Sequence, residues 1–159
     1  MLDQFKKNVE YDYWANDLVL KALSEMTEPP EKAVGIFAHI IFALDVWLAR
    51  LMKEDLSRFT DPHPSYGLAE SRQKLEELHT KWRGYLDSLK SEDLSKKITA
   101  PNTQGKVSEH VVQNILMQVA THSHYHRGQL ATLVHQGGGK RPNTDYIGYA
   151  YVIGESKFV

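Results

Sequence analysis

The N-terminal part of the chain carries apolar side chains at intervals of three and four positions, which is the period of an amphipathic helix. In residues 2–26 the apolar stripe is interrupted only at Asn16 and consists of Leu2, Phe5, Val9, Tyr13, Leu20 and Leu23. Pro29 and Pro30 then end the helix, because proline cannot continue a helix but can begin the next one. The pattern therefore predicts one helix over residues 2–26 and a second over residues 31–53.

The second and third predicted helices lie on either side of a loop. The apolar stripe of the second helix consists of Phe37, Ile40, Ile41, Leu44, Trp47, Leu48 and Leu51. The sequence DPHPSYG at residues 61–67 predicts a loop, because it is rich in proline and glycine. A third helix is expected over residues 68–90, with the stripe Leu75, Leu78, Trp82, Leu86 and Leu89.

A short β-prone segment precedes the last helix. Residues 97–107 contain the turn-forming pairs PN and QG, which favour a small hairpin or an extended connection. We expect Ser108 to cap the fourth helix, with Glu109 near its positive end. The glycine triplet at 137–139 should end this helix.

Four long amphipathic helices favour an all-α fold, a four-helix bundle with a long crossover and a short hairpin-like connection before the last helix. We expect a single domain over residues 1–159, since no repeat or linker divides the chain. The tail, residues 141–159, holds four aromatic residues and is expected to pack on the body of the protein or on a partner.

Composition removes several classes of function. The 19 basic and 20 acidic residues nearly cancel, so charge gives no reason to expect binding to nucleic acid or to an anionic membrane. The absence of cysteine excludes disulfides, thiolate metal ligands and a cysteine nucleophile. The charged N-terminal segment resembles neither a signal peptide nor a membrane helix, so we expect a cytoplasmic protein.

Three histidines fall within the segment THSHYHRGQL, residues 121–130. The inward stripe of the fourth predicted helix runs through Val112, Ile115, Val119, His122, His126, Leu130 and Leu133. His122 and His126 thus occupy positions that the pattern otherwise fills with aliphatic residues. Two histidines four residues apart on a helix lie one turn apart and can bind the same ion. His124 lies about half a turn away and should face outward.

A third ligand must come from another helix, and His39 is the best candidate. It lies in the apolar run FAHIIF, where a buried polar ring needs a partner. The other histidines fit less well. His63 lies in a proline-flanked loop and His79 among charged residues. His110 is too far from His122 along the helix, and His135 lies at the helix end. Three histidines without a fourth side-chain ligand leave a position for water or substrate, as in a catalytic zinc site.

Simpler interpretations exist for each of these residues. His39 alone would be a hydrogen-bonded core histidine, and a pair of histidines four residues apart arises by chance. Gln129 lies near the face of the histidine pair, where it either bonds a ligand ring or points to solvent. Arg127 either pairs with a carboxylate such as Asp45, binds an anionic substrate or forms a surface salt bridge. Gly128 either allows another helix or subunit to approach closely or is simply tolerated within the helix.

The sequence HSHYHRGQ at residues 122–129 resembles the HxxxHRGQ signature of the DinB/YfiT-like family. The resemblance extends over nearly the full chain, through YWAN at 13–16, His39 followed by Trp47, and PNTDY at 142–146. It implies a four-helix bundle with a long crossover, often dimeric. It also implies a divalent metal ion on three histidines, which here fall on His39, His122 and His126.

The resemblance further implies an activity, because relatives include transferases that depend on a metal and on a low-molecular-weight thiol such as bacillithiol, mycothiol or glutathione. We therefore expect a metal- and thiol-dependent S-transferase that acts on a small-molecule electrophile, is a homodimer, and uses zinc or nickel. A metal-dependent hydrolase is an alternative, but it needs a general base, and Asp45 is rotated away from His39 on an ideal helix. A non-catalytic metal-binding protein of the stress response is the third alternative.

Overall fold

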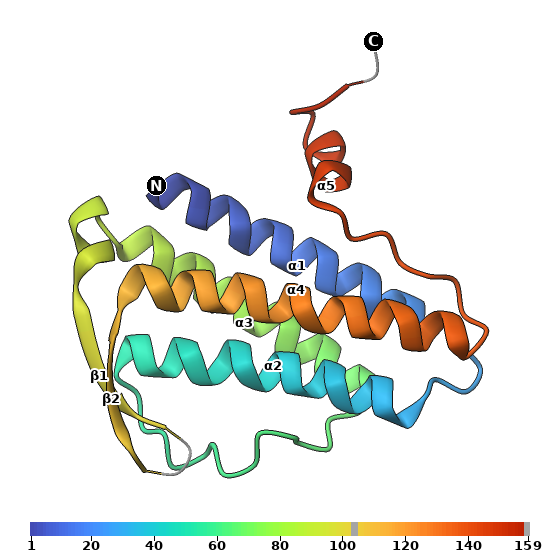
Figure 1. The fold of residues 1–159 in the computed structure, drawn as a ribbon, viewed down its shortest axis with the longest axis horizontal. Coiled ribbons are helices and arrows are strands. Elements are labelled where there is room, and N and C mark those ends of the chain that lie inside the picture. Colours follow the sequence, from blue (N-terminus) through green and yellow to red (C-terminus); the bar gives the residue numbers. More distant parts are fainter. Residues whose placement is uncertain (103–104, 158–159) are drawn as a thin grey trace.

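The computed structural model describes residues 1–102 and 105–157 and contains four long helices packed side by side (Figure 1). These are α1 (Leu2–Ser24), α2 (Glu31–Met52), α3 (Leu68–Ser88) and α4 (Val112–Gln136). The first three follow the predicted apolar stripes, whereas the buried stripe of α4 passes through Ser123 and Arg127 and leaves the predicted inward residues His122 and His126 partly exposed. The ends of the four helices lie within a few residues of the predicted ends. The expected all-α four-helix bundle is confirmed.

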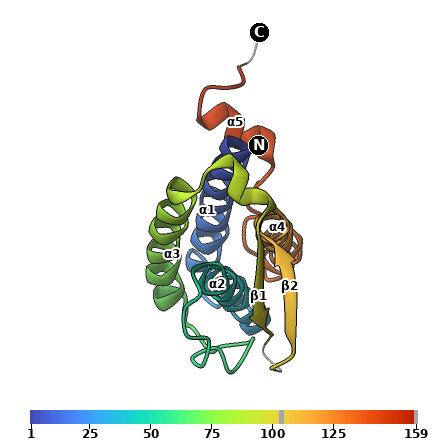
Figure 2. The same ribbon diagram turned by 90° about the vertical axis from the view of Figure 1, so that its left-hand side faces the viewer.

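The order of the helices around the bundle is seen in Figure 2, where α1 lies opposite α2 and α3 lies opposite α4. Each of α1 and α2 therefore packs against both α3 and α4. Residues 53–67 run along the length of the bundle and return the chain to the end where α2 began (Figure 1). This loop is the long crossover, and α2 and α3 consequently run in the same direction.

The core is continuous between the four helices and is richest in residues of α2. Its fully buried side chains include Leu20, Leu23, Phe37, Ile40, Ile41 and Leu130. Among the described residues, α2 is the one helix that is long and apolar enough to cross a membrane. However, 67% of its most apolar window is buried inside the bundle, as in the core helix of a folded domain.

The connection between α3 and α4 contains a hairpin, which is one of the two structures expected from the sequence. After a short 3₁₀ helix, η1 (Ser91–Ser95), strand β1 (Lys97–Pro101) pairs with β2 (Val107–Val111) in antiparallel register. The expectation that Ser108 caps the last helix is wrong, because Ser108 lies in β2 and pairs with Ala100 of β1. The α4 helix begins at Val112, whose amide donates to the carbonyl of Lys96 at 2.9 Å. Thr103 and Gln104 of the expected turn lie outside the described residues.

The glycines after α4 lie close to Met26, in the segment that follows α1, and to the last turn of α4. A Cβ atom on Gly137 would lie 2.8 Å from Met26 Cε, and one on Gly139 would lie 2.8 Å from Val134 Cγ1. The chain then crosses to a short helix that the apolar pattern did not predict, α5 (Tyr146–Val152). It projects from the bundle in Figure 1 and rests on α1 through Tyr149, whose ring contacts Tyr11 and Trp14. Phe158 of the aromatic tail lies outside the described residues.

Candidate metal centre

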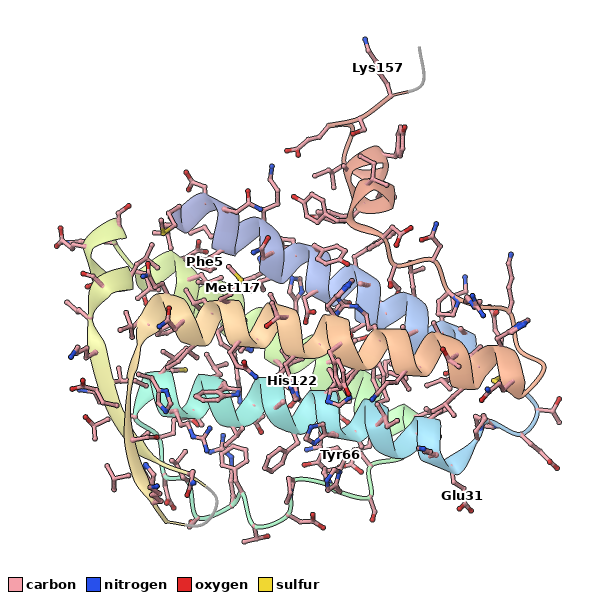
Figure 3. The ribbon with its side chains drawn as sticks, viewed as in Figure 1. Phe5, Glu31, Tyr66, Met117, His122 and Lys157 are labelled. Carbon is pink, nitrogen blue, oxygen red and sulfur yellow. The ribbon has the colours of Figure 1, made fainter. Side chains whose placement is uncertain are left out.

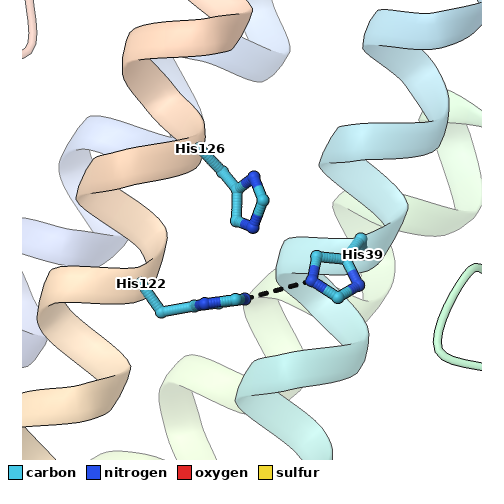
Figure 4. Close-up of side chains that lie close together, drawn as sticks. All are labelled: His39, His122 and His126. Carbon is cyan, nitrogen blue, oxygen red and sulfur yellow. Dashed lines mark hydrogen bonds between the residues drawn. The ribbon is translucent and has the colours of Figure 1, made fainter.

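Three histidines meet between α2 and α4 (Figure 4), and His122 lies near the middle of the bundle in Figure 3. His122 and His126 lie one turn apart on α4, and His39 faces them from α2. One ring nitrogen from each residue lies within 4.8 Å of the other two. Nε2 of His39 lies 3.1 Å from Nε2 of His122. The packing of two apolar stripes thus brings three polar rings to one point.

Hydrogen bonds orient two of these rings from behind. His39 Nδ1 donates to the backbone carbonyl of Pro62 at 2.7 Å, since a carbonyl oxygen can only accept. His126 Nδ1 likewise donates to Oε1 of Gln129 at 2.8 Å. In a neutral imidazole, a proton on Nδ1 leaves the lone pair on Nε2. Both rings therefore direct an unprotonated Nε2 into the space between the helices, which is the arrangement typical of metal-binding histidines.

Burial keeps two of the rings, those of His39 and His122, in the neutral form. Burial lowers the pKa of His122 to about 4, with contributions from neighbouring His126 and His39. Burial also lowers the pKa of His39, although its hydrogen bond to the Pro62 carbonyl opposes the change. Neutral imidazole is the form that binds a metal ion, so protons compete little for these two rings at neutral pH.

The donor set fits a divalent ion. Zinc binds imidazole nitrogen at about 2.0–2.1 Å, which places the nitrogens of a tetrahedral site about 3.3 Å apart. The 3.1 Å between Nε2 of His39 and Nε2 of His122 already matches this spacing. All three rings are partly exposed, so small molecules can approach them. The triad could hold a metal ion and would leave one position to a further ligand.

Comparisons with known proteins assign the family. The sequence model of the DinB superfamily matches residues 15–130. The chain belongs to the DinB superfamily. It is 25% identical to Protein DinB of Bacillus subtilis (strain 168), over 96% of each chain. The solved structure of a DinB-like protein from Bacillus cereus ATCC 10987 aligns with a TM-score of 0.61 at 20% identity, over 89% of this chain and 93% of that one. That structural likeness confirms the fold.

In this member of the DinB superfamily, the crossover loop itself supports the histidine triad. Phe59 inserts its ring against Phe42 of α2, with ring centroids 5.7 Å apart and planes at 86°. Arg58 pairs with Asp45 at 3.0 Å. These contacts fasten the loop that delivers the Pro62 carbonyl to His39. Sequence reasoning missed this carbonyl, because a backbone acceptor leaves no residue-type signal.

Arg127 lies elsewhere than the sequence suggested. The favoured surface salt bridge is wrong, because Arg127 is only 1% exposed. Arg127 does pair with a carboxylate, but this is Asp12 of α1 and not Asp45. Its Nη1 also donates to Oδ1 of Asn16 at 3.3 Å. Burial raises the pKa of Asp12, and the guanidinium charge and its hydrogen bond oppose that rise. Arg127 thus faces α1, while the neighbouring His126 faces α2.

The remaining residues of interest lie outside the triad. His124 is exposed on α4, as expected. His79 stacks on Tyr13 with ring centroids 4.0 Å apart, and its Nε2 lies 3.1 Å from a carboxylate oxygen of Glu10. His110 lies in β2 rather than in the last helix. No atom lies within 4 Å of a Cβ built on Gly128, so no close neighbour within the described chain requires this glycine.

Proposed function

We propose that this protein binds a divalent metal ion at His39, His122 and His126 and uses it to transfer a low-molecular-weight thiol to an electrophile. The observation that supports the proposal is the convergence of three imidazole nitrogens from α2 and α4. Zinc and nickel suit such a set of nitrogen ligands. A bound divalent cation lowers the pKa of a coordinated thiol, so that a thiolate is available at neutral pH.

The residues of this chain have defined tasks in the proposal. The three histidines hold the ion, and burial lowers the pKa of His39 and of His122, which keeps these two rings in the neutral, metal-binding form. The Pro62 carbonyl and Gln129 fix the ring orientations. The chain has no cysteine, so the thiol must come from a co-substrate.

Hydrolysis is less well supported. An activated water needs a nearby general base, and the ligand cluster among the described residues contains histidines alone. Asp45, the carboxylate considered from the sequence, is held by Arg58. A metal-binding protein without catalytic activity, acting in a stress response, is the other alternative, and the experiment below separates it from a transferase.

We further propose that the protein is a cytoplasmic homodimer whose partners are small molecules and not nucleic acids or membranes. The support for self-association is the exposed apolar surface of the short helix α5. Ile147 is 58% exposed and Val152 is 65% exposed, although both are aliphatic. Exposed apolar surface of this kind is typical of a protein interface.

The activity test combines purified protein, zinc or nickel, a low-molecular-weight thiol and a fluorogenic electrophile. A transferase requires both metal and thiol for its rate, and the His122→Ala/His126→Ala variant should lose it. His124→Ala is the matched control, because it removes an exposed histidine of the same helix. A metal-loaded protein that adds nothing to the uncatalysed thiol reaction, but unfolds when the metal is removed, would instead support the non-catalytic alternative.

A further inference from the structure

A fourth histidine lies beside the triad, on the crossover loop. The ring of His63 stacks on that of His39, with centroids 4.9 Å apart and planes inclined by 24°. The rings of His122 and His126 lie at similar centroid distances from His39, 5.1 and 4.9 Å. His63 is exposed, and no hydrogen bond joins its ring nitrogens to any residue that the structure describes. It therefore has free donor atoms next to a candidate metal site.

The loop is built so that His63 stays at this place. The carbonyl of the preceding residue, Pro62, accepts the hydrogen bond from His39 Nδ1. The amide of His63 donates to Oδ1 of Asp61 at 2.8 Å. Proline on both sides, at positions 62 and 64, fixes φ and limits the backbone. The contact between His63 and His39 thus follows from an ordered backbone that is already bonded to one ligand.

The chemistry of the site has room for a further nitrogen donor. Three histidines supply three of the four ligands that zinc usually takes, and a fourth imidazole is a donor of the same kind. His63 stands outside the set whose nitrogens lie within 4.8 Å of one another, so its side chain must turn toward the ion in order to bind. An exposed side chain can turn in this way without disturbing the core.

We infer that His63 is an exchangeable fourth protein ligand of the metal ion held by His39, His122 and His126. In the resting protein His63 closes the coordination position, and it leaves when a co-substrate takes its place. The inference rests on the proposed metal site, and the exchange step also rests on the proposed thiol chemistry. This gives a role to His63, which from the sequence alone ranks below His39 as a ligand because it lies in a proline-flanked loop.

The test compares metal binding by the wild type, His63→Ala and His124→Ala. His124 is the control because it is exposed and close to the triad in sequence but lies outside the ligand cluster. Cobalt(II) alone reports coordination number through its visible absorption, and zinc affinity is measured by competition with a chelator. Thermal unfolding of each metal-free variant verifies that it is folded.

We expect four-coordinate absorption for cobalt in the wild type and in His124→Ala, and a weaker, altered spectrum in His63→Ala. The zinc affinity of His63→Ala should be about tenfold lower or more, since even the loss of a residue that hydrogen-bonds a metal ligand lowers metal affinity about tenfold. An unchanged spectrum and affinity in His63→Ala would overturn this inference and leave the triad and the thiol chemistry intact. A wild type that binds neither cobalt nor zinc would overturn both.

Discussion

The buried contact between α1 and α4 gives the sharpest prediction about stability. Arg127 is 1% exposed, and its charge is balanced by Asp12, which is 5% exposed. Two of its nitrogens, Nε and Nη2, have no hydrogen-bond partner among the described residues, although the guanidinium lies over the ring of Tyr11. Replacing Asp12 with leucine would leave a buried positive charge without a partner. A cavity of about 30 Å³ next to Asp12 gives the leucine room.

The magnitude follows from the contacts that are lost. Removing one partner of a buried ion pair costs about 3–5 kcal/mol, so Asp12→Leu should lower the free energy of unfolding by that amount. The double variant Asp12→Leu/Arg127→Met removes the stranded charge. It still deprives the fully buried Asn16 of bonds to Asp12 at 2.9 Å and Arg127 at 3.3 Å. Unpaired buried amide groups cost about 1–3 kcal/mol, so the double variant should be the more stable of the two.

Urea unfolding at neutral pH, followed by circular dichroism, measures both free energies of unfolding in the metal-free protein. The slope against denaturant should stay the same, since neither change alters the surface that unfolding exposes. A double variant that is as unstable as Asp12→Leu, or less stable, would refute the argument. It would show that the packing of the new side chains, and not the unpaired charge of Arg127, determines the loss in free energy of unfolding.

Three more predictions follow from the structure. Gln129→Leu removes the acceptor for His126 Nδ1 and should weaken zinc binding about 10- to 100-fold in a chelator competition, with little change in stability. The pKa of His122 is lowered to about 4 in the folded protein, so the unfolded chain binds more protons below pH 6.5. Metal-free protein should therefore lose stability as the pH falls from 6.5 to about 4, whereas a His122→Ala variant should show a smaller decrease in its urea midpoint. Gly139→Ala should destabilise the protein by about 1–3 kcal/mol through contact with Val134 and Met26, whereas Gly128→Ala meets open space and should raise the melting temperature.

The apolar pattern predicted the bundle because each long helix buries one face. His122 and His126 lie beside the buried stripe of α4, which passes through Ser123 and Arg127, and they are partly exposed on the side that faces α2. The last helix was predicted to begin too early because residues 107–111 pair with a strand ten residues earlier. The turn-forming pairs indicated a hairpin, but they did not show that its second strand extends to Val111.

The sequence did hold a partial signal for the buried ion pair. The predicted stripe of the first helix is interrupted at Asn16, and Asp12 lies one turn earlier on the same face. Two polar residues in these positions indicate a buried partner, but nothing in the local pattern names Arg127 as that partner. The Pro62 carbonyl and the position of His63 could not be predicted either, since both depend on how the crossover loop folds over α2.

The central claim is that His39, His122 and His126 hold a divalent metal ion, and metal content tests it most directly. The measurement is elemental analysis of purified, tag-free protein beside the His122→Ala/His126→Ala variant, before and after exposure to zinc or nickel. We predict close to one ion per chain in the wild type and a loss of that ion in the variant. A wild-type protein that contains no metal and takes up neither ion would contradict the claim, and the three histidines would then be hydrogen-bonded residues of the bundle.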